Sequence, residues 1–534
     1  MPNEARGSGC SAGGTLDLRP DPKPCGTKLP GTLLVQTESV TWHAASFLLT
    51  QFFLLMVAAG AFFTFWMMPY RGRHWVRSAG IRPELRLVIG SAIVILCGFL
   101  FIHSLRGVLH DATLAEADLR LHNTVRLFRS EVLHQRFSGV SRAASTAFLL
   151  PMVVVLSGIA WKAGRRREAV GVAASFLFQI VLSNALKYTV HRARPPDAIP
   201  LHLGPSFPSG HTMAAVVVYG FLAYLLLRGR ERNRWVVIPA GALIVLIAFV
   251  PISRVYLGVH WPYDTIGSLT LGAALLGILV TLYKYPPVDH WILESDPGAA
   301  PWFMKTAAAC VFTTIVAAFI TGYLRELPEA RPALPPSRGS LSFGALQSFP
   351  PQLKKTSEDL IGGPMEPLAF LLVGSPDQVR RAFARAGWEL ADTPSLAGLA
   401  RELIEVVENA PDPHGPVAPA YFDAQPQDFT FERPGTPSGS IRHRHYTRIW
   451  RAPLLIDPNQ QPLWVATCSD EMPYLITHRI DPNVDGEREM IATQLRAAGA
   501  RDVAFVTVTG PQRGRNAGGD SLFTDGRAHV LLLP

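Results

Sequence analysis

Three short segments combine the residue types that are needed to hold and attack a phosphoryl group. They are KYTVHRARP (187–195), PSGH (208–211) and SRVYLGVHWPYD (253–264), and each of them adjoins a long apolar run. Cationic side chains neutralise phosphate oxygens, and arginine can grip two such oxygens in one plane. The three segments therefore predict an anion site with phosphoryl-transfer chemistry.

Five of these residues are predicted to bind the phosphate. Lys187, Arg194 and Arg254 supply fixed positive charge. Ser209 and the backbone N–H of Gly210 add donors at a helix N-terminus, where free amides and the helix dipole favour an anion. Glycine also lets the backbone approach a ligand closely.

The two histidines are predicted to do different work. Asp264 follows His260 by four residues, and a carboxylate bonded to one ring nitrogen leaves the other nitrogen to attack phosphorus. His211 follows Ser209 and Gly210 directly, and a nearby phosphate would favour its protonated form. His260 with Asp264 is therefore the predicted nucleophile pair and His211 the predicted general acid. No metal or cofactor is expected here.

Each residue alone also has a structural explanation. Arg254 or Lys187 would serve as an anchor at the membrane interface, His211 as a headgroup-level histidine and Asp264 as a helix cap. Ionisable groups at membrane edges are costly, however, and they rarely recur at three places that face one cavity. The combination favours catalysis.

The elements that must position these segments are apolar runs. The chain of 534 residues is 48% hydrophobic and 17% charged, with a mean hydropathy of +0.20, which is too apolar for a soluble protein. A soluble helical bundle would need polar helix faces, which runs such as LLTQFFLLMVAAGAFFTFW lack. The predicted fold is an all-α polytopic membrane bundle of about eight transmembrane helices. The predicted spans are 46–68, 87–105, 145–161, 170–190, 209–227, 236–253, 264–283 and 304–323.

Basic residues in the short loops predict the orientation. Clusters of arginine and lysine follow the first, third and fifth spans, and such loops remain in the cytoplasm. The three motifs and the intervening loop at 106–144 then face outward. The side of the N-terminus is left open, because the tail is itself basic. The net charge of +9 is explained by attraction of these loops to anionic headgroups, without a nucleic-acid partner.

The composition changes after the last span. Residues 325–366 are rich in Pro, Ser and Gly and predict a linker. Residues 367–534 alternate strand and helix signals, such as PLAFLLVG before a helix capped by Ser375, and predict a soluble α+β domain. The predicted parts are a tail (1–45), an extra transmembrane helix with a basic loop (46–84), a membrane core (85–285), a loop with an extra transmembrane helix (286–324), the linker (325–366) and the C-terminal domain (367–534).

The five cysteines are too few and too scattered for a disulfide framework. Cys97, Cys310 and Cys468 lie in apolar stretches and are predicted to be small core residues. Cys10 and Cys25 could pair if both lie outside the membrane.

A group of polar residues in the C-terminal part suggests metal binding at first sight. It comprises His443, His445, His478, Asp481 and Asp485. Their spacing matches no known ligand pattern and arginines crowd them, so a turn stabilised by ion pairs is preferred.

The order of the motif residues resembles the signature of the type 2 phosphatidic acid phosphatase superfamily. That signature is Lys, six residues, Arg-Pro; then Pro-Ser-Gly-His; then Ser-Arg, five residues, His, three residues, Asp, and every fixed position is present. The resemblance implies a six-helix core in the second to seventh spans. It also implies metal-independent hydrolysis of a phosphomonoester or diphosphate through a phosphohistidine, with the roles assigned above.

The C-terminal part resembles the LssY-type C-terminal domain, which accompanies such phosphatases in some bacterial membrane proteins. The resemblance rests on RPGTPSGSIRHRHYTRIWRAP, PLWVATCSDE and ITHRIDPNVDGEREMIATQLRAAGA, and no activity follows from it. Arg442, Arg444, Arg448 and Arg451 are candidates for contact with anionic headgroups or a cell-envelope polymer.

The sequence thus predicts a lipid phosphatase integral to a bacterial plasma membrane, with its active site and C-terminal domain extracytoplasmic. Candidate substrates run from phosphatidate-like lipids to undecaprenyl diphosphate. One alternative is a lipid-phosphate transporter or binding protein, which would need the positive charge but not the His260–Asp264 pair. Another is a vanadate-dependent haloperoxidase, whose vanadate cradle uses the same residue types but occurs in soluble proteins.

Overall fold

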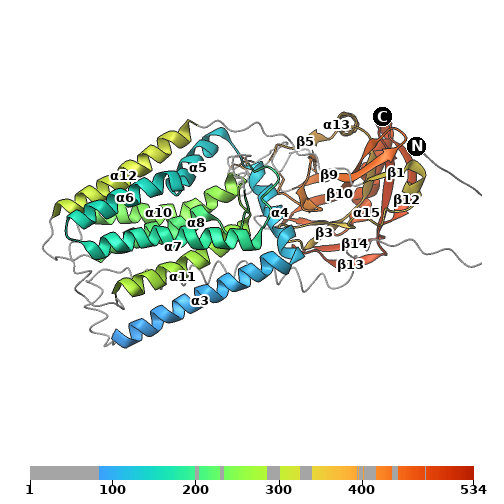
Figure 1. Cartoon of the computed structure of the whole chain (residues 1–534). Helices are drawn as coiled ribbons and strands as arrows, with labels where there is room; N and C mark the ends of the chain where they lie inside the picture. The colour runs from blue at the N-terminus through green and yellow to red at the C-terminus, as the bar shows by residue number, and fades with distance from the viewer. Residues whose placement is uncertain are drawn as a thin grey trace, which may run out of the picture. The chain divides into compact units, whose positions relative to one another are not determined.

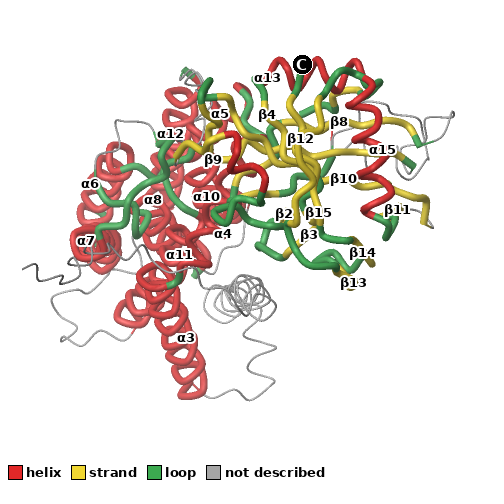
Figure 2. Tube along the Cα trace, turned by 90° about the vertical axis from the view of Figure 1, so that its right-hand side faces the viewer, coloured by secondary structure: helices red, strands yellow, loops and turns green. Residues whose placement is uncertain are grey.

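The computed structural model describes most of the chain after its N-terminal region. The described residues are 83–198, 204–228, 234–284, 301–324, 339–393, 417–435, 443–474 and 477–534, with 395, 398 and 401. The first predicted span, and with it Cys10 and Cys25, lies outside them. The described part contains a group of long helices and, later in the chain, a region that is mostly strands (Figures 1 and 2).

The long helices coincide with the predicted apolar runs. They are α3 (Pro83–His110), α6 (Thr146–Lys162), α7 (Arg166–Val190), α10 (Arg234–Tyr256), α11 (Pro262–Lys284) and α12 (Pro301–Tyr323). The fifth predicted span is built from α8 (Gly210–Ala214), the π-helix η2 (Ala215–Tyr219) and α9 (Gly220–Leu227).

The predicted number of about eight spans is not confirmed. Among the described residues, six helices are long and apolar enough to cross a membrane. They are α3, α7, the fifth span (Gly210–Leu227), α10, α11 and α12. A seventh span is present if α5 (Glu131–Ala143) and α6 form one span that is bent by 41°.

The segment 106–144 differs from the expected loop, because it contains two polar helices. Asp111 Oδ1 accepts hydrogen bonds from the backbone N–H groups of Thr113 (2.9 Å) and Leu114 (3.3 Å) at the start of α4 (Ala112–Leu127). Ser130 caps α5 in the same way. Because α4 buries polar side chains, including Asp118, it lacks the apolar periodicity that would have indicated a helix.

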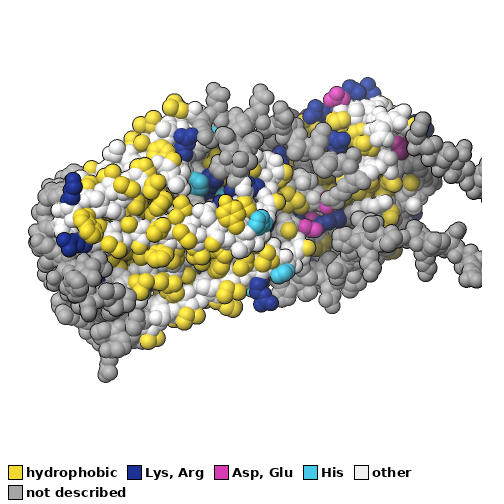
Figure 3. All heavy atoms as spheres, viewed as in Figure 1, with side chains coloured by type: hydrophobic (Ala, Val, Ile, Leu, Met, Phe, Trp, Pro, Cys, Tyr) yellow, Lys and Arg dark blue, Asp and Glu magenta, His cyan; other side chains and the backbone are white. Residues whose placement is uncertain are grey.

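Apolar side chains are prominent on the face of the helical part that Figure 3 shows. Exposed examples on four helices are Ile95 (71%), Val181 (59%), Ile238 (67%) and Phe312 (68%). Water would disfavour so large an apolar surface, whereas lipid accommodates it. Inside, small residues let helices approach closely: a Cβ on Gly322 of α12 would collide with the backbone of Gly139 in α5.

The C-terminal region is built around a nine-stranded mixed sheet. Its main strands run in the order β12 (Arg501–Thr507), β15 (Arg527–Leu532), β4 (Phe370–Val373), β10 (Gln461–Tyr474), β9 (Arg444–Asp457), β8 (Phe429–Pro434) and β5 (Glu389–Leu390), while β1 (Gly339–Ser342) pairs with β9 and β11 (Thr477–Ile480) with β10. A smaller sheet has the order β3 (Pro364–Pro367), β2 (Thr356–Glu358), β6 (Tyr421–Phe422), β7 (Gln425–Pro426), and β13 (Gln512–Arg515) pairs with β14 (Ser521–Thr524).

Alternate residues of the central strand β4 face opposite sides of the large sheet. Phe370 and Leu372 belong to the core that includes α13 (Pro376–Arg385) and α15 (Val484–Ala497), while Leu371 and Val373 belong to the core of the other face. Ser375 caps α13 in a reciprocal capping box with Gln378, as the sequence predicted. The second predicted helix, at 395–410, falls mostly outside the described residues.

Part of the predicted linker is incorporated into this domain. Residues 339–342 form β1, which pairs in parallel with β9, and β2 and β3 form an antiparallel pair. Proline is tolerated at strand edges, so a proline-rich composition did not reveal these short strands. Cys97 and Cys468 are buried and Cys310 is half-buried, as expected for core residues.

Candidate active site

The tight turn between α10 and α11 places His260 against Asp264. His260 Nδ1 lies 3.3 Å from Asp264 Oδ2, and the Trp261 backbone N–H donates to the same oxygen at 3.0 Å. Both members of the pair are fully buried. Gly258 has a φ of +71°, and a Cβ there would meet the Arg129 guanidinium. Glycine therefore permits the turn that brings the predicted nucleophile onto its carboxylate.

Two residues that the sequence analysis did not single out hold this pair in place. Arg192 Nη1 donates to Asp264 Oδ1 at 2.7 Å, and Arg192 Nη2 donates to Asp118 Oδ2 at 2.6 Å. The other oxygen of Asp118 accepts from the Tyr263 backbone N–H at 3.0 Å. One guanidinium thus bridges two carboxylates, and Asp264 is fixed on the side opposite His260.

Arg192 and Asp118 differ in whether the sequence contained a signal for them. Arg192 lies within KYTVHRARP, so its position in a motif was a signal. Asp118 lies in the segment that was expected to be a loop, and no motif there gave a signal for it. Burial raises the pKa of Asp118 to about 7, although the neighbouring Arg192 charge opposes the rise.

Arg254 is the most unusual charge of the site. Its side chain is 3% exposed, and Nη1 donates to Ser141 Oγ, while Nε and Nη2 are buried without a hydrogen-bond partner. Lys187 and Arg194 both lie close enough for mutual charge repulsion with it. Buried cations normally have a counter-charge, so this group of cations is suited to bind an anion.

Arg194 also has a structural role. Its Nη1 donates to the backbone carbonyl of Val259 at 2.6 Å, and Nε donates to that of Gly204 at 2.9 Å. A third bond, from Nη2 to Pro205 O, is 3.3 Å long. A guanidinium has five N–H groups, so Arg194 can tie the first motif to the residue before His260 and still offer donors to a phosphate.

The second motif begins a helical span. Ser209 is buried and caps α8, and its Oγ accepts from the Thr212 backbone N–H (3.5 Å) and from Thr212 Oγ1 (3.1 Å). Both bonds use Oγ as the acceptor, so the hydroxyl hydrogen can be donated to a phosphate oxygen. Gly210 and the partly exposed His211 follow in the first turn.

The structure therefore brings the three motifs together through side-chain contacts. Arg192 of the first motif binds Asp264 of the third, and the Ser209 backbone N–H of the second motif donates to Ser268 Oγ at 2.6 Å, one turn after Asp264. Within this group, six charged side chains interact electrostatically. They are the cations Lys187, Arg192, Arg194 and Arg254 and the carboxylates Asp118 and Asp264.

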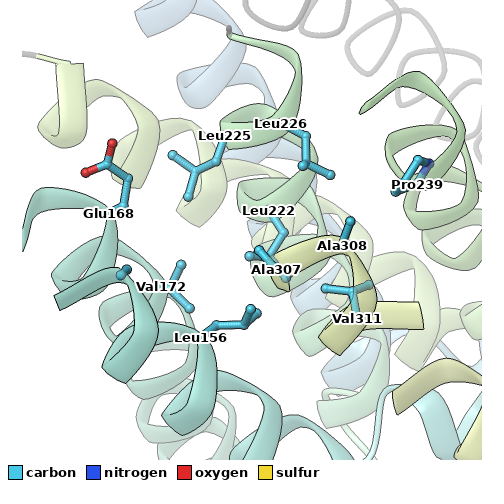
Figure 4. Close-up of a pocket in the computed structure, with 11 residues that line it drawn as sticks. Leu156, Glu168, Val172, Leu222, Leu225, Leu226, Pro239, Ala307, Ala308 and Val311 are labelled. Carbon is cyan, nitrogen blue, oxygen red and sulfur yellow. The ribbon is translucent and has the colours of Figure 1, made fainter. Parts of the chain in front are cut away.

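A pocket elsewhere in the helical part is not this site. It is lined by α6, α7, α9, α10 and α12, with Glu168 at its edge (Figure 4). Glu168 and Lys187 are both in α7 and are 19 residues apart, which corresponds to about 28 Å along a helix. No residue of the three motifs lines the pocket.

Two of the four arginines that were predicted to contact headgroups are buried in the C-terminal domain. Arg444 is buried and donates to Glu471 (2.8 Å) and Glu432 (3.2 Å), and the buried Arg448 donates to Glu366 at 3.1 Å. That prediction is wrong for these two residues, because β9 directs them into the domain. Arg442 lies outside the described residues.

The C-terminal metal candidates separate into two groups. Asp485 lies in the first turn of α15, where it accepts from Arg488 Nη1 (2.9 Å) and Thr524 Oγ1 (2.7 Å), so it has the expected ion pair but within a helix. His445 instead lies beside Asp470 and Glu487, neither of which the sequence analysis named. The His478 side chain lies outside the described part.

Two regions of the chain match models of known protein families. Residues 168–287 match the family model of the PAP2 superfamily, and residues 350–528 match the model LssY C-terminus. Phosphatidylglycerophosphatase B of Bacillus subtilis is 32% identical over 182 residues, which cover 33% of this chain and 88% of that protein. The chain therefore belongs to the PAP2 superfamily, and its apolar helices make it an integral membrane protein.

Two further proteins are similar to part of the chain. Undecaprenyl-diphosphatase of Sulfolobus acidocaldarius is 31% identical over 130 residues, which cover 23% of this chain and 59% of that protein. The crystal structure of a transmembrane PAP2-type phosphatidylglycerolphosphate phosphatase from Bacillus subtilis shares 28% identity. The match covers 36% of this chain and 97% of the crystallised phosphatase, with a TM-score of 0.32.

Proposed function

We propose that the chain is a membrane lipid phosphatase. The observation that carries the proposal is the buried Arg254 guanidinium, two of whose nitrogens have no hydrogen-bond partner, in a group of cations beside the His260–Asp264 pair. A bound phosphate would supply both the missing counter-charge and the missing acceptors. The two relatives named above are lipid phosphatases by name, which supports the same class of reaction.

The proposed reaction has two steps. His260 Nδ1 faces Asp264, so Nε2 attacks phosphorus while the bond from phosphorus to the lipid oxygen breaks, and His211 gives that oxygen a proton. In the second step His211 takes a proton from water, and the resulting hydroxide displaces His260 and releases inorganic phosphate. Lys187, Arg194 and Arg254 neutralise the equatorial oxygens, a task that a metal ion performs in other enzymes. We propose that no metal takes part.

The proposed substrates are amphipathic phosphates, because the site adjoins helices whose outer faces suit lipid. Phosphatidate-like monoesters and undecaprenyl diphosphate both fit a site that grips the phosphate and contacts the lipid at the helix surface. The basic loops support an extracytoplasmic active site in a bacterial plasma membrane. An alkaline phosphatase fusion after residue 330 should then be active and a fusion after Arg232 inactive, and the reverse pattern would place the site in the cytoplasm.

Phosphate release from purified full-length protein in detergent tests the function. Phosphatidate, lysophosphatidate and undecaprenyl diphosphate would be compared for the wild type, His260→Ala and a control, His191→Asn. His191 is an exposed histidine with a positive φ in the first motif, and asparagine tolerates that conformation. Release by the wild type and the control but not by His260→Ala is expected. Tight lipid binding without release in any protein would instead indicate a transporter or binding protein.

A further inference from the structure

A second cluster of histidine and carboxylates lies in the C-terminal domain. His445 of β9 and Asp470 of β10 are direct cross-strand partners, and Glu487 of α15 packs over the same face of the sheet. One potential ligand atom from each residue lies within 4.8 Å of the other two. We refer to these three residues as the His445 cluster.

Both carboxylates of the His445 cluster approach the same ring nitrogen. Glu487 Oε2 lies 3.0 Å and Asp470 Oδ1 lies 3.4 Å from His445 Nδ1. A ring nitrogen carries at most one hydrogen, so it cannot make a full hydrogen bond to each. In a tetrahedral site with bonds of 2.0–2.1 Å, ligand atoms are about 3.3 Å apart. The observed separations therefore suit ligands that share one ion.

The same domain contains a contrasting histidine. His529 Nε2 lies 3.1 Å from Glu489 Oε1, and His529 Nδ1 lies 2.8 Å from Asp502 Oδ2. Each carboxylate there has its own ring nitrogen, so the contacts need no shared ion. The residue types are the same as in the His445 cluster, and only the convergence on one nitrogen differs.

The His445 cluster is also poor in compensating positive charge. The Glu487 side chain is 6% exposed. Its Oε2 contacts His445 Nδ1, whereas its Oε1 is buried with no hydrogen-bond partner. Nearby Arg488 is engaged by Asp485 and Asp525. Among the described residues, Arg433 and His443 also lie near the cluster, and Asp481 adds a further negative charge.

We propose that His445, Asp470 and Glu487 bind a divalent transition-metal ion of the Zn²⁺ type. One imidazole and two carboxylates are a donor set that such ions accept. His443, whose Nε2 lies 3.7 Å from Asp470 Oδ1, stands where it or a water can provide the fourth ligand. The ion would join α15 to β9 and β10 and so stabilise the folded domain. The site is independent of the proposed phosphatase reaction.

Metal analysis of the full-length protein, purified in detergent and freed of any affinity tag, tests this proposal. The protein would be stripped with a chelator, equilibrated with Zn²⁺ and dialysed. The wild type should retain about one Zn²⁺ per chain beyond any adventitious level. Glu487→Gln and His445→Ala should each weaken binding by more than the roughly 10–100-fold that outer-shell changes cost. The matched control His529→Gln should bind as the wild type does.

A stability measurement checks that the variants report on binding and not on misfolding. Zn²⁺ should raise the melting temperature of the wild type and of His529→Gln, but not that of Glu487→Gln, which keeps the side-chain size and should remain folded. If Glu487→Gln fails to fold, Asp470→Asn takes its place. Equal Zn²⁺ binding by wild type and Glu487→Gln, or no Zn²⁺ retained by the wild type, would overturn the proposal. Zn²⁺ content and melting temperature do not depend on phosphatase activity. A failure of the phosphatase proposal would therefore leave both results of this test unchanged.

Discussion

The His260–Asp264 pair and the His445 cluster differ in the sign of the charge that surrounds them. In the membrane core, Asp264 orients His260, while Arg192 neutralises Asp264 and three further cations stand nearby. In the C-terminal domain, two carboxylates converge on one nitrogen of His445. An imidazole against a carboxylate is thus compatible with opposite ligands, and the surrounding charges decide whether an anion or a cation fits.

The first cluster also shows how one carboxylate can be kept available for a histidine. Arg192 binds Asp264 through one oxygen and leaves the other to His260 and the Trp261 backbone. In the His445 cluster, the described residues include no arginine that bridges the two carboxylates in this manner. The comparison predicts that changes in the first cluster affect turnover and that changes in the second affect metal content.

Removal of the proposed nucleophile should have the largest effect. His260→Ala should lower turnover by roughly 10⁵–10⁶-fold, as the loss of a nucleophile does elsewhere. Binding of a non-hydrolysable lipid phosphonate should persist, because Lys187, Arg194 and Arg254 remain. After rapid quench of a ³²P-labelled substrate, acid-labile and alkali-stable label should map to His260. Label on another residue would show that His260 is not the nucleophile, and the proposed difference in role between His260 and His445 would be wrong.

Removal of the proposed general acid should have the next largest effect. His211→Ala should lower turnover of a lipid substrate by roughly 10²–10⁴-fold, the usual contribution of a positioned acid or base. The loss should shrink for p-nitrophenyl phosphate, whose leaving group departs without a proton. The same loss on both substrates would assign His211 to binding instead. The measurement is kcat for each substrate.

The bridging arginine should matter less, because it acts through Asp264. Arg192→Lys keeps the charge but cannot bridge two carboxylates, so kcat should fall by roughly 10–100-fold, as for other orienting residues. Asp118→Asn should act similarly, and the double variant should lose less than the product of the two losses. An increase in KM with unchanged kcat would place Arg192 in phosphate binding rather than in positioning.

A chelator should have the smallest effect on turnover and so separates the two clusters most directly. Hydrolysis of p-nitrophenyl phosphate should stay within about two-fold of its initial rate, since fixed cations do the work of a metal. The same treatment should remove Zn²⁺ from the His445 cluster. Activity that disappears with the chelator and returns with a divalent ion would contradict the proposed division between the clusters.

Local pattern explains which features could be predicted. The apolar runs, the strands around PLAFLLVG and PLWVATCS, and the Ser375 cap depend on neighbouring residues, and the structure has them. The pairing of His260 with Asp264 is also local, because four residues separate the two. The number of spans was not settled, since a bent pair such as α5 and α6 is not distinguished by hydropathy.

The sequence by itself determined the residue types of the phosphatase motifs and the membrane character of the chain, because both depend on composition and short spacing. Only the tertiary structure decided that Arg192 bridges Asp118 and Asp264 across 74 and 72 residues, that Arg448 turns inward to Glu366 across 82, and that Glu487 meets His445 across 42. Such contacts depend on which strand and helix faces pack together and in which register. Register is set by the burial of whole faces, so no short stretch of sequence contains it.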